Sequence, residues 1–415
     1  MVAGTLLADG AEPFRTDINP ALRYYEAFLV APQALSQADS DYLVSSKGKE
    51  KKLPERFAGI VAGSDLQYRV VREAGHAAVR CDWGVDTSAG PNTLLPHLGR
   101  AKVTSRTGQL RAVWELEHGK QAEARDDLVA AFVLGRNAGS DALLIGAMVQ
   151  CAIEDMNYVT VAEHFEEFAP ETLQELVAGF DAAPARCTMA ACMPSEREFS
   201  TWVRNKLIEL RKAYPDDDAK VMAGFRGSGL VQTLDSIGYT NFWPRLLAAS
   251  GGTSEGTLKL LQEMEPLWPR ATEIMGLPEP EYENEAKQFI IELHASPNPF
   301  VAILEPLFTG WAVHPQRWQG FGTRPREFEA QAELAMVHAA LEYKLHGEAG
   351  VKSVMDPFGT APFSYRRFVF KGRDRGFELR SAYAGADAPF VMIFVEKRGP
   401  AFEVNGPEAG KAIVP

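Results

Sequence analysis

The first residues whose types could perform chemistry are Cys81, Asp82 and His97, which lie close together in the sequence. A cysteine, a histidine and an aspartate are the residue types of a cysteine hydrolase, in which the histidine takes the thiol proton. Catalytic groups usually meet across a fold rather than along the chain, so a loop held by Trp83 is the favoured interpretation. Asp82 and His97 remain candidates for a hydrolase site assembled from dispersed residues.

A second candidate set, His338, Glu342 and His346, recurs at every fourth position of a predicted helix. That spacing places the three side chains near one helix face, where they could ligate a metal ion. His338 also falls on an apolar stripe, and His346 lies near the helix end, where a protonated histidine complements the helix dipole. The structural interpretation is favoured, and we predict neither a metal nor a cofactor. The His338 and Glu342 pair also belongs to the hydrolase alternative.

The four cysteines include no CxxC pair, so a zinc site of the finger type is not expected. Cys187 and Cys192 lie five positions apart, between Pro184 and Pro194. They could close a small loop as a disulfide in an oxidising compartment. Alternatively, all four cysteines are buried thiols, and the sequence leaves both interpretations open.

The remaining short motifs favour structural roles. Asp216, Asp217 and Asp218 follow Pro215 and are expected to begin a helix, because negative charge is favourable near a helix N-terminus. The sequence contains no GxxxxGK[ST] phosphate loop and no HExxH zinc motif. We therefore predict no catalytic residue and no metal ligand, and the binding residues remain unknown.

Composition narrows the classes of partner. The chain has 415 residues and a net charge of −12, and an acidic surface repels the phosphates of nucleic acids and lipids. A lysine-rich run over residues 47–52 is expected to be a solvated loop. No run of eighteen apolar residues occurs, so no integral membrane segment is expected. Residues 1–10 are similar to the end of a secretory leader without its basic region, which leaves export open.

Helical periodicity dominates the sequence as far as about residue 310. Asn19 and Pro20 predict a helix start, with Leu22, Tyr25 and Leu29 sharing one face. A helix beginning at Pro170 and a break at His118-Gly119 between two helices are also expected. The clearest apolar stripe has the spacing of one helix face and comprises Ala142, Ile145, Gly146, Val149, Ala152, Ile153 and Met156.

Two further patterns concern helix starts and repeats. Ser195 and Glu198 form a capping-box pattern, which predicts that a helix begins there. The hairpin expected over residues 112–139 resembles one tetratricopeptide unit, with Trp114 and Gly119 in the appropriate order. A solenoid needs about three such units to bury its faces, so an ordinary helical hairpin is favoured.

The C-terminal part has a different pattern. A helix over residues 327–346 precedes three predicted strands, over residues 363–370, 377–382 and 389–396, with glycine-rich turns between them. Asp356 is expected to cap a turn, Pro357 to fix its φ angle, and Gly359 to take a conformation closed to other residues. Tyr365 and Phe377 are expected to pair across strands.

This helix, the Asp356-Pro357-Phe358-Gly359 turn and the following hairpin resemble the soluble end of the major pseudopilin of type II secretion. The resemblance implies a bacterial envelope protein and covers only part of the C-terminal region. The hydrophobic helix that assembles pseudopili is not matched, so assembly is not implied. Residues 384–388 offer one carboxylate, whereas Ca²⁺ takes about six to eight oxygen ligands, so calcium is not expected either.

We therefore predict a mainly α protein, a multi-helix bundle or short helical array with a small C-terminal α+β module. The expected organisation is a flexible N-terminus or leader remnant (1–16), a helical body (17–311), a linker (312–326) and a helix plus β-hairpin module (327–415). The expected function is a non-catalytic extracytoplasmic scaffold, in the periplasm or envelope, that binds a protein or peptide. The alternatives are a hydrolase with a dispersed site and a cytoplasmic helical-repeat adaptor.

Overall fold

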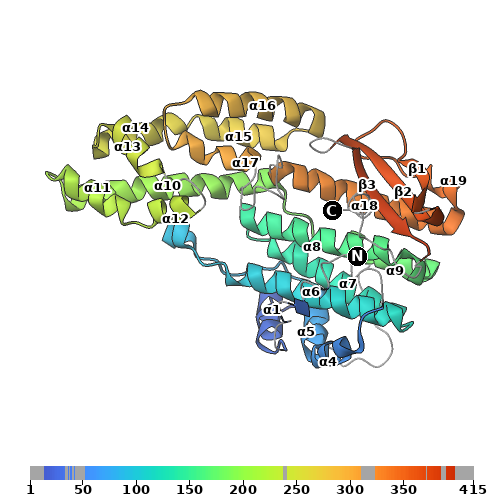
Figure 1. The fold of residues 1–415 in the computed structure, drawn as a ribbon. Helices are drawn as coiled ribbons and strands as arrows, with labels where there is room; N and C mark the ends of the chain where they lie inside the picture. Colours follow the sequence, from blue (N-terminus) through green and yellow to red (C-terminus); the bar gives the residue numbers. More distant parts are fainter. Residues whose placement is uncertain are drawn as a thin grey trace.

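The computed structural model describes residues 14–32, 36, 38–39, 42, 52–236, 241–309, 323–370, 372–384 and 389–397. Within these residues the chain is mainly helical and carries one three-stranded antiparallel sheet near its C-terminal end (Figure 1), which confirms the predicted fold class. No helix in the described ranges is long and apolar enough to cross a membrane. Most of the expected linker (312–326) and of residues 384–388, where calcium is not expected, falls outside these ranges.

The first part of the chain forms a layer of antiparallel helices. A long hairpin of two helices breaks at His118-Gly119 as predicted, where Gly119 has a φ angle of 75° that favours glycine. The short N-terminal helices pack on one side of this hairpin (Figure 1). The elements of this layer are α1 (Pro20–Leu29), η1 (Glu55–Phe57), α4 (Ala58–Gly63), α5 (Asp65–Gly75), α6 (Pro96–Glu117) and α7 (Gln121–Ala138). The short η2 (Thr87–Asn92) lies away from this layer and packs on helix α10 (Met189–Ala213), where Trp202 donates a hydrogen bond to the Ser88 carbonyl oxygen.

A second group of helices carries the sheet. Helix α8 packs on α7 and on α18, and the sheet lies beside α18 (Figure 1). Apolar side chains of α6 to α9, of α18 and of the sheet share one hydrophobic core. The elements are α8 (Leu144–Glu163), η3 (Phe165–Glu167), α9 (Pro170–Asp181), α18 (Thr323–His346), α19 (Glu348–Val351), β1 (Ser364–Phe370), β2 (Arg373–Ala384) and β3 (Pro389–Val395).

A third group of helices forms an arm. Helix α10 carries the chain away from α8, and α15 to α17 return it to α18 (Figure 1). The elements are α10 (Met189–Ala213), α11 (Asp218–Arg226), α12 (Leu230–Ser236), α13 (Phe242–Ser250), α14 (Ser254–Met264), α15 (Leu267–Gly276), α16 (Glu279–Ala295), η4 (Val301–Ile303) and α17 (Glu305–Thr309).

The helix starts were predicted with mixed success. The Asn19 side chain accepts a hydrogen bond from the Ala21 amide, as its capping role requires. The Asp217 side chain caps α11 by accepting a hydrogen bond from the Lys220 backbone amide. The capping-box prediction was wrong, because α10 begins at Met189 with Thr188 as its cap. Ser195 therefore lies inside the helix, one residue after Pro194.

Two predicted helix faces were also wrong in part. Leu29 of α1 is 86% exposed, and the buried face of that helix carries Tyr24 and Ala27 instead. In α8, Ile153 is fully buried but Ile145 is 52% exposed. The reason is that polar residues of α8 occupy the buried face, and they are Gln150, Glu154 and Asn157.

The turn before the sheet is organised by Asp356. Its buried carboxylate accepts hydrogen bonds from the Phe358 amide, from the Ser381 hydroxyl and from the Ala382 amide. Gly359 does not have the expected left-handed φ angle, but a Cβ atom there would lie 3.2 Å from the Cβ of Ala382. The close approach of β2, rather than the backbone conformation, is therefore what favours glycine.

The sheet has the order β1-β2-β3. Tyr365 and Phe377 are in contact, with ring centroids 5.7 Å apart, but Tyr365 stands opposite Leu379 and Phe377 opposite Arg367. The predicted aromatic pair is therefore diagonal rather than directly cross-strand.

Candidate functional site

The residues of the cysteine-hydrolase hypothesis, Cys81, Asp82 and His97, have the contacts of structural residues rather than of a catalytic site. The buried His97 ring stacks on Trp83 with centroids 4.6 Å apart, and its Nε2 lies 3.9 Å from an Asp141 oxygen. Burial lowers the pKa of His97 to about 4 and raises the pKa of the Cys81 thiol to about 12. The Asp82 carboxylate accepts a hydrogen bond from the Gly84 amide. A thiol that stays protonated at neutral pH is not an activated nucleophile.

The histidines of α18 form separate pairs. His338 Nε2 lies 3.0 Å from Asp181 of α9, whereas His346 Nε2 lies 3.6 Å from Glu342. Among the described residues, no group of three histidine, cysteine or acidic side chains is placed to hold a metal ion. The structure therefore does not assemble these residues with His97 and Asp82 into one site.

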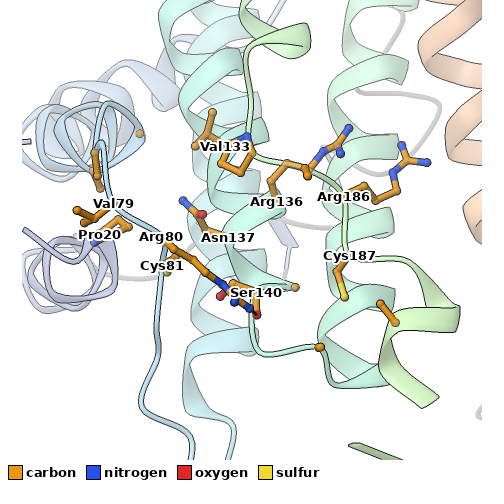
Figure 2. A pocket seen from close by; sticks show the side chains of 18 residues that line it. Pro20, Val79, Arg80, Cys81, Val133, Arg136, Asn137, Ser140, Arg186 and Cys187 are labelled. Carbon is orange, nitrogen blue, oxygen red and sulfur yellow. Dashed lines mark hydrogen bonds between the residues drawn. The ribbon is translucent and has the colours of Figure 1, made fainter. Parts of the chain in front are cut away.

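A different place in the structure has the shape of a binding site. A cavity of about 430 Å³ lies where the starts of α1 and α10, the ends of α5 and α7, and the segment before α10 converge (Figure 2). This volume falls in the range of sites that bind small molecules, about 300–1,000 Å³. Its walls are partly apolar, with Pro20, Val79 and Val133, and partly polar, with Asn137 and Ser140.

The charged residues on the cavity walls are of one sign. The described residues that line it include Arg80, Arg136 and Arg186 but no aspartate or glutamate. Arg80 is exposed and donates a hydrogen bond of 2.7 Å to the Ser140 carbonyl oxygen. In a chain of net charge −12, this cavity is a local region of positive charge.

The other two arginines share one buried carboxylate behind the wall. Glu154 is fully buried in α8, and its two oxygens lie 2.7 Å from Arg136 Nε and 2.6 Å from Arg186 Nη2. Burial raises the pKa of Glu154, whereas both arginines favour its ionised form. The two guanidinium groups therefore share the Glu154 carboxylate, and the Glu327 carboxylate also acts on Arg186.

The segment before α10 is held in place through its backbone. The Gln150 side chain accepts from the Cys187 amide at 3.1 Å and donates to the Cys187 carbonyl oxygen at 3.3 Å. Gly139 permits this approach, because a Cβ atom there would lie 2.7 Å from Gln150 Oε1 and 3.0 Å from the Cys187 Cβ. Arg186 also donates to the carbonyl oxygens of Glu327 and Ala330 in α18.

The structure shows where the four cysteines lie. All four cysteines are free thiols, and Cys81, Cys151 and Cys192 are buried. Cys187 is half-buried and lines the cavity, and its sulfur lies 3.5 Å from that of Cys192. The two cysteines that could form a disulfide are therefore adjacent but not bonded.

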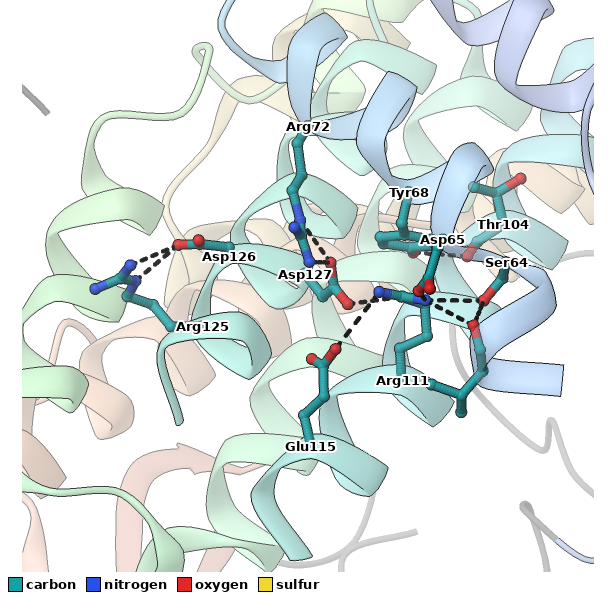
Figure 3. A network of polar contacts seen from close by, with 11 residues as sticks. Ser64, Asp65, Tyr68, Arg72, Thr104, Arg111, Glu115, Arg125, Asp126 and Asp127 are labelled. Carbon is teal, nitrogen blue, oxygen red and sulfur yellow. Dashed lines mark hydrogen bonds and ion pairs between the residues drawn. The ribbon is translucent and has the colours of Figure 1, made fainter. Parts of the chain in front are cut away.

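A second charged cluster lies between α5, α6 and α7 (Figure 3). Asp127 is fully buried and accepts hydrogen bonds from Arg72 and from Arg111. Arg111 also donates to Asp65 and contacts Glu115 at 3.4 Å. We call these five residues the α7 network. Its hydrogen bonds and ion pairs join helices α5, α6 and α7 to one another.

Sequence reasoning missed both charged clusters. The cavity arginines come from three separate segments, and no motif links them. One available signal was the pair Arg136 and Glu154, charged residues on predicted helices that also carry long apolar stripes. A scan against protein-family models found no match to this chain, and neither did searches of the curated proteins and of the solved structures.

Proposed function

We propose that the chain is a non-catalytic binding protein that takes the C-terminal carboxylate of a peptide partner into the arginine-lined cavity. The observation that carries this proposal is the set of three arginines, without an acidic residue, among the described residues that line a cavity of about 430 Å³. Guanidinium groups bind carboxylates through paired, charge-assisted hydrogen bonds. The apolar wall at Val79 and Val133 suits the last side chains of a peptide.

The exposed Arg80 is the residue best placed to meet an incoming ligand. Arg136 and Arg186 are held by Glu154, so they supply a fixed positive field rather than mobile side chains. Preorganised charge of this kind favours an anion without the cost of ordering flexible groups. The Asn137 and Ser140 side chains add polar groups on the cavity wall.

An envelope location remains part of this proposal. It is supported by the similarity of residues 1–10 to a secretory leader and by the C-terminal resemblance to pseudopilins. Fractionation of the source cells tests it separately from binding. Recovery of the chain with cytoplasmic markers would overturn the location and leave the cavity hypothesis standing.

The binding test uses the full chain, immobilised with its thiols reduced. We expect it to retain a pool of random hexapeptides with free C-termini at least about tenfold better than the same pool with amidated C-termini, as charge-assisted hydrogen bonds imply. Bound peptides are quantified by mass spectrometry. Equal retention of the two pools would contradict the proposal.

The Arg80→Gln variant tests the site itself. It removes an exposed positive charge, and we expect it to lower retention of the free-acid pool about threefold to tenfold without changing the unfolding midpoint. Arg204→Gln on α10 is the control, because Arg204 is also exposed but does not line the cavity. If both variants bind like the parent, the ligand does not use this cavity.

A further inference from the structure

We infer that Cys187 and Cys192 form a reversible dithiol–disulfide pair that sets the affinity of the arginine-lined cavity for its anionic ligand. This inference rests on the proposed function of the cavity and names how it is regulated. It is carried by the position of Cys187 on the cavity wall and by the 3.5 Å separation of the two sulfur atoms.

The capping of α10 explains why the two cysteines meet. Thr188 is the N-cap, and its hydroxyl accepts a hydrogen bond from the Ala191 amide at 3.1 Å. Cys187 is therefore the residue before the cap and Cys192 the fourth residue of the helix. These are the two positions whose side chains pack together in a hydrophobic staple. Here the contact consists of two thiols.

Closure requires movement of the side chains more than of the backbone. The sulfur atoms must approach from 3.5 Å to a bond of about 2.05 Å. The Gln150 side chain holds both the amide N–H and the carbonyl oxygen of Cys187, and Cys192 lies within the first turns of α10. The pair is thus positioned for bond formation while the helix start remains fixed.

The two thiols differ in their exposure and in the direction of their pKa shifts. Cys187 is half-buried and Cys192 is fully buried, so a soluble disulfide reaches Cys187 first. The hydrogen bond from Cys192 lowers the pKa of the Cys187 thiol, whereas the pKa of Cys192 is raised. A lowered pKa increases the thiolate fraction, and the thiolate is the nucleophile.

The reaction is a thiol–disulfide exchange with a low-molecular-weight disulfide such as oxidised glutathione. The Cys187 thiolate attacks one sulfur of that disulfide, which forms a mixed disulfide and releases one glutathione thiolate. Cys192 loses its proton to that thiolate and attacks the Cys187 sulfur, which releases the second glutathione. The protein loses two electrons and two protons, and the glutathione disulfide gains them.

Oxidation changes the charge of the cavity. In the reduced protein, the Cys187 sulfur on the wall carries a negative charge whenever the thiol is ionised, one residue from Arg186. A disulfide is neutral, and it also fixes the residue that follows Arg186. Both effects favour an anionic ligand, so the oxidised protein is expected to bind more tightly.

The test equilibrates the full chain in glutathione buffers of graded potential and counts thiols by alkylation and intact mass. Parent protein is expected to lose two alkylatable thiols reversibly and to gain no glutathione. Cys187→Ser is expected to lose none, and Cys192→Ser to lose at most one, as a glutathione adduct that intact mass identifies. Cys81→Ser, which changes a buried cysteine away from this pair, is expected to behave like the parent. Failure of the parent to form the bond, or to reopen it, would overturn the inference and leave the cavity proposal untouched.

The second readout is retention of the free-acid hexapeptide pool by the oxidised and the reduced protein. We expect the oxidised parent to retain it about threefold better, and the Cys187→Ser variant to show no redox dependence. Equal retention by two redox forms that both bind would overturn the regulatory role, although the disulfide forms. Absence of retention by either form would overturn the cavity proposal and this inference with it, whatever the thiol count shows.

Discussion

The α7 network and the cavity wall use the same residue types in opposite proportions. In the network, two guanidinium groups meet three carboxyl groups, those of Asp65, Glu115 and Asp127. At the cavity wall, the guanidinium groups of Arg136 and Arg186 share one carboxylate. Helix α7 carries both Asp127 and Arg136, so one helix contributes to both clusters.

This difference separates a structural cluster from a candidate binding site. A buried charge is stable when nearby groups of opposite charge and hydrogen-bond donors satisfy it. In the α7 network, Arg111 meets carboxyl groups and also the Ser64 hydroxyl and the Val61 carbonyl oxygen, whereas the described residues that line the cavity include arginines and no acidic residue. Arginines alone therefore do not identify a site, but their ratio to carboxylates and their access to a cavity do.

The largest expected loss of stability follows a substitution in the α7 network. Asp127→Ala leaves Arg72 and Arg111 without their shared buried partner and is expected to reduce the free energy of unfolding by about 3–5 kcal/mol. Urea denaturation measures it, with Asp126→Ala as the control at the neighbouring exposed position. If the two variants unfold alike, the network does not hold the helices together.

A smaller effect is expected at the cavity wall. Arg136→Gln leaves Glu154 paired with Arg186, so we expect a loss of about 2 kcal/mol, less than for Asp127→Ala. The same denaturation experiment measures it, and Arg100→Gln at an exposed position of α6 is the reference. A loss as large as that of Asp127→Ala would show that the two clusters are equally structural, and the comparison above would fail.

The smallest effect depends on pH. Burial raises the pKa of Glu115 to about 8, so the native carboxyl keeps its proton where the unfolded chain has lost it. Stability from this group is fully present below about pH 4.5 and is lost as the pH rises towards 8. The glutamine of the Glu115→Gln variant does not titrate, so the variant does not lose this stability as the pH rises.

We expect the stability of Glu115→Gln relative to the parent to rise between pH 5 and pH 8. Thermal or urea unfolding across this range measures the change, and Glu123→Gln provides an exposed control on α7. A pH-independent difference would show that Glu115 is ionised throughout and belongs with Asp127 as a charged partner of Arg111.

Much of the fold could be predicted because local signals specify it. Pro170 begins α9, His118-Gly119 separates α6 from α7, and the three strands lie where alternating and β-prone residues predict them. The face of α8 was misplaced because charged and amide side chains count as exposed in a periodicity argument. Glu154 is buried only because Arg136 and Arg186 meet it, and that pairing depends on the tertiary fold.

The site was harder to predict for the same reason. The cavity joins segments around residues 20, 80, 136 and 186, and no local spacing relates them. The cysteine pair was recognised by its spacing, but its proximity depends on Thr188 as the helix cap. The sequence pattern had instead placed the start of that helix at Ser195. Had Thr188 been identified as the helix cap, the contact between Cys187 and Cys192 could have been predicted.

Helix α8 has a consequence for how the molecule loses its structure. Its first turns pack in the core of the arm, Ile153 in the core around α1 and α5, and Tyr158 in the core shared with the sheet. The Glu196 side chain of α10 also accepts a hydrogen bond from the Leu144 amide at the start of this helix. Fraying of any one core exposes a surface of α8 that the other two cores hold in place. Helix α8 therefore couples the stability of the three cores to one another.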